Sequence, residues 1–150
     1  MNQGLTGVVL PADSPFSLDL GIQVLEWASG RALITLDIDG RHTNRRGVAH
    51  GGVIATLADM ALSLAWRSAA PERPPAGTVN LNVSFVAPAR GRLTAEGRLL
   101  HMSGGCAFCE GRILNEDGGL AAVAQGTFRM RQPAANLNEI VQPSGQAQSQ

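Results

Sequence analysis

A single carboxylate lies in the middle of a long segment of apolar and small residues. In the stretch HGGVIATLADMALSLAW, Asp59 is the only charged residue between His50 and Arg67. An isolated ionised carboxylate is costly to bury, so a segment that could otherwise be wholly buried needs a reason to keep one. Two interpretations are open. Asp59 is satisfied by polar neighbours on one side of a helix, or it faces an active site as a base or nucleophile.

Three residues at the start of this segment, His50, Gly51 and Gly52, could supply the complementary chemistry. The backbone N–H groups at a helix start lack intrahelical partners, and the helix dipole favours a developing negative charge there. Glycines leave those groups open to a ligand, although they could equally serve only to ease a tight turn. A carbonyl polarised at Gly51 and a carboxylate at Asp59 would be the two halves of an acyl-transfer site.

The spacing of these two halves sets a geometrical condition. Eight residues of helix separate Gly51 from Asp59 by about 12 Å along the axis, whereas a reacting carbonyl must lie about 3 Å from both partners. One helix therefore cannot easily serve both ends of one substrate. Two antiparallel copies around a two-fold axis can, since each brings its Gly51 end toward the Asp59 of the other. If this chemistry is right, the sequence predicts a dimer with two shared sites.

The element that carries these residues is predicted from periodicity. Residues 49–69 contain no proline and are followed by PERPPAG, which predicts one central helix of about five turns. Its apolar residues occupy nearly all sides, which indicates that other elements wrap it. Its polar residues follow one narrow line at spacings of three or four: Thr56, Asp59, Ser63 and Arg67.

Alternating segments bounded by turn residues predict six strands around this helix. Two precede it as a hairpin turning near Gly30, and four follow it. They are expected within residues 20–29, 31–39, 78–88, 91–102, 106–118 and 119–131. Such a sheet with one apolar helix predicts an α+β protein with the hot-dog fold, in which a mostly antiparallel six-stranded sheet wraps a long central helix.

Length and composition limit the remaining possibilities. The 150 residues suit one domain, expected over 19–131, with a leader segment at 1–18 that includes a short helical turn and a disordered tail at 132–150. Lys plus Arg and Asp plus Glu are balanced at 12 each, so no net field favours nucleic acid or an anionic membrane. The N-terminal residues lack a signal peptide and the apolar run is too short to span a bilayer, so we expect a soluble, cytoplasmic protein.

The two cysteines, in the sequence CAFC, could suggest a metal or redox motif. The segment alternates like a strand, which puts the Cα atoms of Cys106 and Cys109 roughly 10 Å apart with their side chains on opposite faces. Structural thiols are therefore expected, and no metal site.

The segment NRRGVAHGGVIATLAD, residues 44–59, resembles the signature of hot-dog acyl-CoA thioesterases of the phenylacetate-degradation (PaaI) type. The similarity extends to TVNLNVSFVAPARG and AAVAQGTFRM, and covers roughly residues 20–131. This resemblance implies hydrolysis of an acyl- or aryl-acyl-CoA to the free acid and CoA, with no cofactor besides the coenzyme A of the substrate. It also implies a homodimer, commonly assembled further into a homotetramer, with sites between subunits.

The resemblance assigns roles by position in the signature. Asp59 would be the general base or nucleophile, and the Gly51 N–H would polarise the thioester carbonyl. Asn44 would lie across the site and hold the leaving sulfur or the water. Thr78 would position the hydrolytic water, and His50 would be an orienting hydrogen-bond partner, unless it is only a structural loop residue.

The coenzyme contacts depart from the family pattern. Relatives often carry a basic residue after a glycine near the coenzyme A phosphates, whereas HMSGGCAF has none after Gly105. Arg90 and Arg92, beside APARG, are then the expected phosphate contacts, because a guanidinium suits phosphate oxygens, although both could be solvated surface charges. Gly52 is expected to leave room for the coenzyme. Four residues are candidates for the acyl pocket or for ordinary core: Met60, Leu64, Trp66 and Phe85.

Three rival functions compete with hydrolysis. An α/β-hydrolase esterase is excluded because the chain has no G-x-S-x-G and is too short for that fold. A hot-dog dehydratase differs in the placement of its His and carboxylate relative to His50 and Asp59. A non-catalytic acyl-CoA binding or sensor protein of the same fold remains open, since a fold that holds a thioester need not cleave it.

Overall fold

The computed structural model describes residues 14–130, and its elements follow the order expected from the sequence. The expected tail at 132–150 and most of the expected leader lie outside the described residues, while α1 occupies the short helical turn expected within that leader. The elements are α1 (Pro15–Leu20), β1 (Gln23–Ala28), β2 (Arg31–Asp37), the 3-10 helix η1 (Gly40–His42), α2 (Gly51–Ala69), β3 (Pro75–Phe85), β4 (Arg92–Ser103), β5 (Cys106–Leu114) and β6 (Leu120–Met130).

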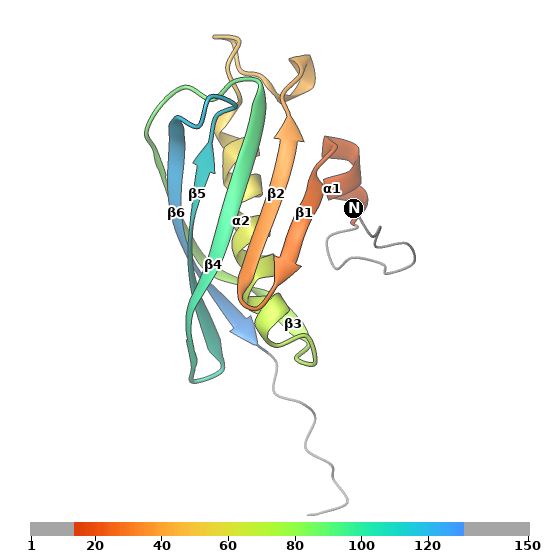
Figure 1. Ribbon diagram of the computed structural model, residues 1–150, viewed down its shortest axis with the longest axis vertical. Helices are drawn as coiled ribbons and strands as arrows, with labels where there is room; N and C mark the ends of the chain where they lie inside the picture. Colours follow the sequence, from red (N-terminus) through yellow and green to blue (C-terminus); the bar gives the residue numbers. More distant parts are fainter. Residues whose placement is uncertain (1–13, 131–150) are drawn as a thin grey trace, which may run out of the picture.

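The six strands form one sheet in the order β1-β2-β4-β5-β6-β3, with every neighbouring pair antiparallel. In Figure 1, β2 and β4 lie in front of α2, which runs along the other side of the sheet. The predicted hot-dog architecture is therefore confirmed. β1 and β3 are the two edges of the sheet, and within the described residues the outer side of β3 has no partner strand.

The helix α2 supplies the centre of the core, as its apolar residues predict. Trp66, a candidate for the acyl pocket or for ordinary core, is only 1% exposed and packs in this core. It is therefore a core residue. β1 is also tied to the helix, because the indole N–H of Trp27 donates to the carbonyl of Leu64 at 2.8 Å. The buried α2 residues are Ile54, Leu57, Ala58, Ala61, Leu62, Leu64, Ala65 and Trp66.

Glycines in the middle strands let α2 lie close to the sheet. Gly97 of β4 is paired with Gly111 of β5. A Cβ at Gly97 would overlap the backbone carbonyl of Ala61 on the helix, and one at Gly111 would overlap the backbone carbonyl of Glu96 on β4 and lie 2.9 Å from a methyl group of Leu62. Glycine within a strand is often a sign of such close approach. No local sequence pattern indicated these two positions.

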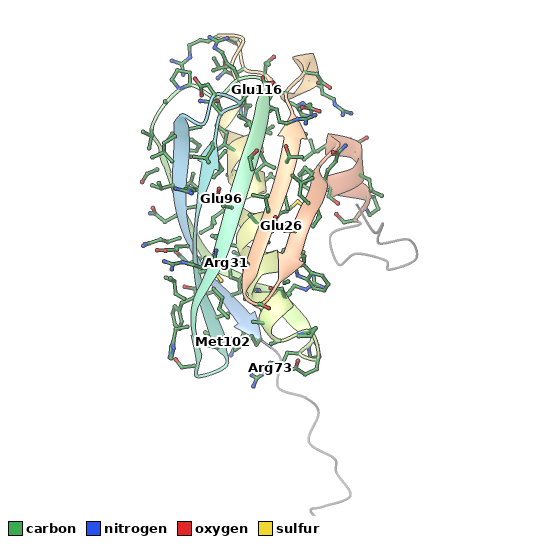
Figure 2. All side chains as sticks on the ribbon, in the orientation of Figure 1. Glu26, Arg31, Arg73, Glu96, Met102 and Glu116 are labelled. Carbon is green, nitrogen blue, oxygen red and sulfur yellow. The ribbon has the colours of Figure 1, made fainter. Side chains whose placement is uncertain are left out.

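The opposite face of the sheet carries charged side chains. Cross-strand ion pairs join Arg98 to Glu110 and Arg112 to Glu96. Figure 2 shows Glu96 and Glu26 on this face, turned away from α2. These pairs are exposed and so contribute little to stability. Along β4 and β5, these outward-facing charged residues alternate with inward-facing residues of the core.

The two cysteines are free thiols, as expected for structural residues. Burial raises the pKa of Cys109 to about 12, so this thiol stays protonated near neutral pH. Within residues 14–130 no three His, Cys, Asp or Glu side chains gather in a way that could hold a metal ion. The same part of the chain contains no helix with the length and apolarity needed to cross a membrane.

Candidate active site

The start of α2 is held by a loop that folds back on itself. His42 is buried, its Nδ1 accepts the backbone N–H of Asp39 at 3.1 Å, and its Nε2 therefore donates to the carbonyl of Leu20 at 3.0 Å. The carbonyl of His42 accepts the N–H of His50 at 2.8 Å. These hydrogen bonds hold His50, the residue that immediately precedes the helix, in place.

His50 caps α2 and leaves one backbone donor open. Its Nδ1 accepts the N–H of Gly52 at 2.9 Å, and its carbonyl accepts the N–H groups of Val53 and Ile54. The Gly51 N–H has no acceptor among the described residues. His50 thus orients the first turn of α2, which fits both the orienting role and the structural role considered for it. Gly52, expected at the coenzyme, has its N–H engaged by the cap.

A cavity of about 570 Å³ opens beside this open N–H, and we name it the helix-start cavity. Gly51 and Asn44 both line it, so the structure brings these two predicted residues together. Asn44 closes the turn before the helix, since its side-chain oxygen accepts the N–H of Arg46 at 2.8 Å. The ring of Phe85 lies against Gly51, 3.5 Å from where a Cβ would be. The lining residues are Asn44, Arg46, Val48, Ala49, Gly51, Ile54, Phe85, Val86, Ala87, Pro88, Ala89 and Arg90.

Asp59 lies half-buried on α2, and its partner comes from β3. The hydroxyl of Thr78 donates to Oδ1 of Asp59 at 2.8 Å. The Thr56 hydroxyl instead donates to the carbonyl of Gly52 at 2.9 Å. The carboxylate is therefore held by the threonine that the family resemblance assigned to the site, rather than by Thr56 on its own helix.

A second cavity, of about 470 Å³, adjoins Asp59, and we name it the Asp59 cavity. The predicted polar line of α2 forms one wall of it. Met60 and Leu64, two of the acyl-pocket candidates, also line it, as does Phe16 of α1. Nothing in the sequence indicated that α1 would reach this site. The lining residues are Ser14, Phe16, Ala55, Thr56, Asp59, Met60, Ser63, Leu64, Arg67 and Leu81.

The two cavities share no lining residue within the described chain. Gly51 and Asp59 are both on the straight run of α2, so about 12 Å of helix rise separates them. Within one chain, the open N–H of Gly51 and the carboxylate of Asp59 are therefore too far apart to contact the same carbonyl group. The two antiparallel copies expected from the sequence stay a prediction.

The two arginines expected at the phosphates differ in placement. Arg90 lines the helix-start cavity, and its Nη1 donates to the carbonyl of Gly47 at 3.0 Å. Arg92 is not among the lining residues of either cavity and makes two hydrogen bonds to Asp37, of 2.7 and 2.9 Å. The hydrogen bond from Arg92 lowers the pKa of Asp37 and raises that of the guanidinium. Arg46, which no sequence pattern indicated as a site residue, lines the cavity with Arg90.

Comparison with known proteins gives the family. The sequence profile of the Thioesterase superfamily matches residues 46–122, just over half of the chain. A candidate esterase of Halobacterium salinarum is 38% identical over 88 residues, which cover 55% of this chain and 58% of that protein. Human acyl-coenzyme A thioesterase 13 is 33% identical over 73 residues, 46% of this chain and 49% of that one. The chain thus spans about half the length of these curated relatives.

A solved structure supports the same assignment over more of the chain. A mutant of the phenylacetic acid degradation protein PaaI from Thermus thermophilus is 29% identical, with a TM-score of 0.71. The match covers 79% of this chain and 100% of that one. The profile, the shared hot-dog fold and the signature at 44–59 agree, and we conclude that this chain belongs to the Thioesterase superfamily and is of the PaaI-like type.

Proposed function

We propose that this protein is a thioester hydrolase that cleaves an acyl- or aryl-acyl-CoA to the free acid and CoA. The observation that carries the proposal is the hydrogen bond of 2.8 Å by which Thr78 orients the carboxylate of Asp59. The open N–H of Gly51 at the helix start supplies the complementary group. The names of the relatives support the reaction class.

The proposed reaction uses Asp59 as a general base or as a nucleophile. As a base, its carboxylate takes a proton from water while the water oxygen bonds to the thioester carbonyl carbon. The negative charge that forms on the carbonyl oxygen is stabilised by the Gly51 N–H and the start of α2. The C–S bond then breaks, and the thiolate of CoA takes the proton back from Asp59.

The proposed site combines two subunits. The helix-start cavity of one copy would face Asp59 and Thr78 of the second copy, because these groups are too far apart within one subunit. The outer edge of β3 offers a route to such pairing, since Val79 on this strand is 62% exposed and no described strand covers the edge. A two-fold axis there would set the two α2 helices antiparallel. A tetramer of such dimers and a cytoplasmic location stay predictions.

The proposal is tested by thiol release from a panel of acyl-CoA thioesters with short, medium, long and aryl acyl groups. We expect release of CoA from at least one of them, and the ranking would give the acyl preference of the Asp59 cavity. Acyl-CoA thioesters that bind to the protein without any release of thiol would contradict hydrolysis and favour the sensor alternative.

Replacing Thr78 with valine tests the hydrogen bond to Asp59. The Thr78→Val variant keeps the β-branched shape but loses the donor, so we expect kcat to fall about tenfold or more with little change in KM. Thr78→Ser keeps the hydroxyl and should retain most of the activity. Steady-state kinetics on the best thioester measure both values. A valine variant as active as wild type would remove Thr78 from the site.

A further inference from the structure

We propose that Arg46 and Arg90 form a two-guanidinium site for the phosphate groups of coenzyme A, and that Arg46 helps the enzyme select coenzyme A over carriers without these phosphates. The inference rests on the proposed function. It adds a residue, Arg46, which lies two positions after Asn44 inside the signature segment and to which the resemblance assigned no role.

The charge of the helix-start cavity is the first argument. Two guanidinium groups and no carboxylate are found among its described lining residues. Arg46 and Arg90 have no carboxylate partner within the described part of the chain. Two like charges that share one cavity without a counter-ion favour an anionic ligand. In contrast, five other arginines are ion-paired: Arg41, Arg73, Arg92, Arg98 and Arg112.

The backbone geometry holds the two arginines on facing loops. Arg46 is on the turn between η1 and α2, where its N–H donates to Asn44. Arg90 is on the connection between β3 and β4, where its N–H donates to the side-chain oxygen of Asn115 at 2.9 Å. Nη1 of Arg90 reaches across to the carbonyl of Gly47, at 3.0 Å, next to Arg46. A guanidinium has five N–H donors, so Arg90 keeps donors for a phosphate after making this bond.

The position in the cavity relates the phosphates to the reaction. Gly51, which would polarise the thioester carbonyl, lines the same cavity of about 570 Å³. The pantetheine arm of coenzyme A would have to run from the two arginines to Gly51, so that one subunit would hold both the phosphate end and the thioester end of the substrate, and the second subunit would supply Asp59. Arg92, with its guanidinium bound to Asp37, is not needed for this contact.

The test compares two thioesters of the same acid. Acyl-CoA carries the phosphates, and the N-acetylcysteamine thioester does not. For Arg46→Gln and for Arg90→Gln we expect KM for acyl-CoA to rise about tenfold, with kcat little changed and with KM for the N-acetylcysteamine thioester unchanged. Arg45→Gln is the matched control, because Arg45 is the exposed neighbour that does not line the cavity.

Two results would overturn this inference. One is an equal rise of KM for both thioesters in Arg46→Gln. The other is a rise of KM for acyl-CoA in Arg45→Gln that is as large as the rise in Arg46→Gln. Calorimetric titration with coenzyme A and with pantetheine separates this inference from the proposed function, because it needs no hydrolysis. Coenzyme A that binds wild type more tightly than it binds Arg46→Gln would support the phosphate site even if no thioester were cleaved, and equal binding would contradict it.

Discussion

The Asp59→Asn variant is expected to lower kcat for thioester hydrolysis by about a thousandfold. Asparagine has nearly the same size, and its amide oxygen can still accept the hydrogen bond from Thr78, so the fold of this region should persist. An amide cannot take a proton from water or attack a thioester as a carboxylate does. Thiol-release kinetics measure the effect, and KM for acyl-CoA should change little.

A matched control exists for this substitution. Asp117 is an exposed carboxylate on the turn between β5 and β6, where its Oδ1 accepts the N–H of Gly119 at 2.8 Å. Asp117→Asn should therefore leave kcat unchanged. A folded Asp59→Asn protein with the kcat of wild type would contradict the catalytic role of Asp59.

The Gly97→Ala variant should lose about 3 kcal/mol of unfolding free energy. The added methyl would overlap the carbonyl of Ala61, which belongs to the helix backbone and cannot rotate away. Either α2 must shift from β4 or the strand must bend, and both changes loosen a closely packed core. Urea unfolding, followed by far-UV circular dichroism, measures the difference.

Gly40→Ala is the control variant, because Gly40 lacks this contact. A Cβ at Gly40 would meet nothing within 4 Å, and its φ is not positive. The stability of this variant should stay within about 0.5 kcal/mol of wild type. If Gly97→Ala unfolded at the same urea concentration as Gly40→Ala, the close approach of α2 to β4 would be contradicted.

The elements were predictable from local patterns, whereas the contacts between them were not. The apolar run of α2 and the alternation of the strands are properties of neighbouring residues, and both predictions are confirmed. The pairing of Gly97 with Gly111 joins two strands, so neither glycine could be recognised before the register was known. Similarly, no local pattern indicated that Phe16 would line the Asp59 cavity.

The sequence predicted the positions of some site residues and not of others. Spacing along one helix already separated Gly51 from Asp59, and the structure assigns them to different cavities. Arg92 was expected near phosphate, but it is directly opposite Asp37 in the register of β2 and β4. The sequence could not show this pairing, because it depends on which residues two distant strands place side by side.

Subunit complementation is the most direct test of a shared thioester-hydrolysing site. Gly51→Pro removes the open N–H at a position where proline suits a helix start, and Asp59→Asn removes the carboxylate. Each variant alone should be nearly inactive. In a mixed dimer, one site would keep both native groups, so random exchange of equal amounts should restore about a quarter of wild-type activity. No recovery, with exchange verified by native mass spectrometry, would contradict a site built from two subunits.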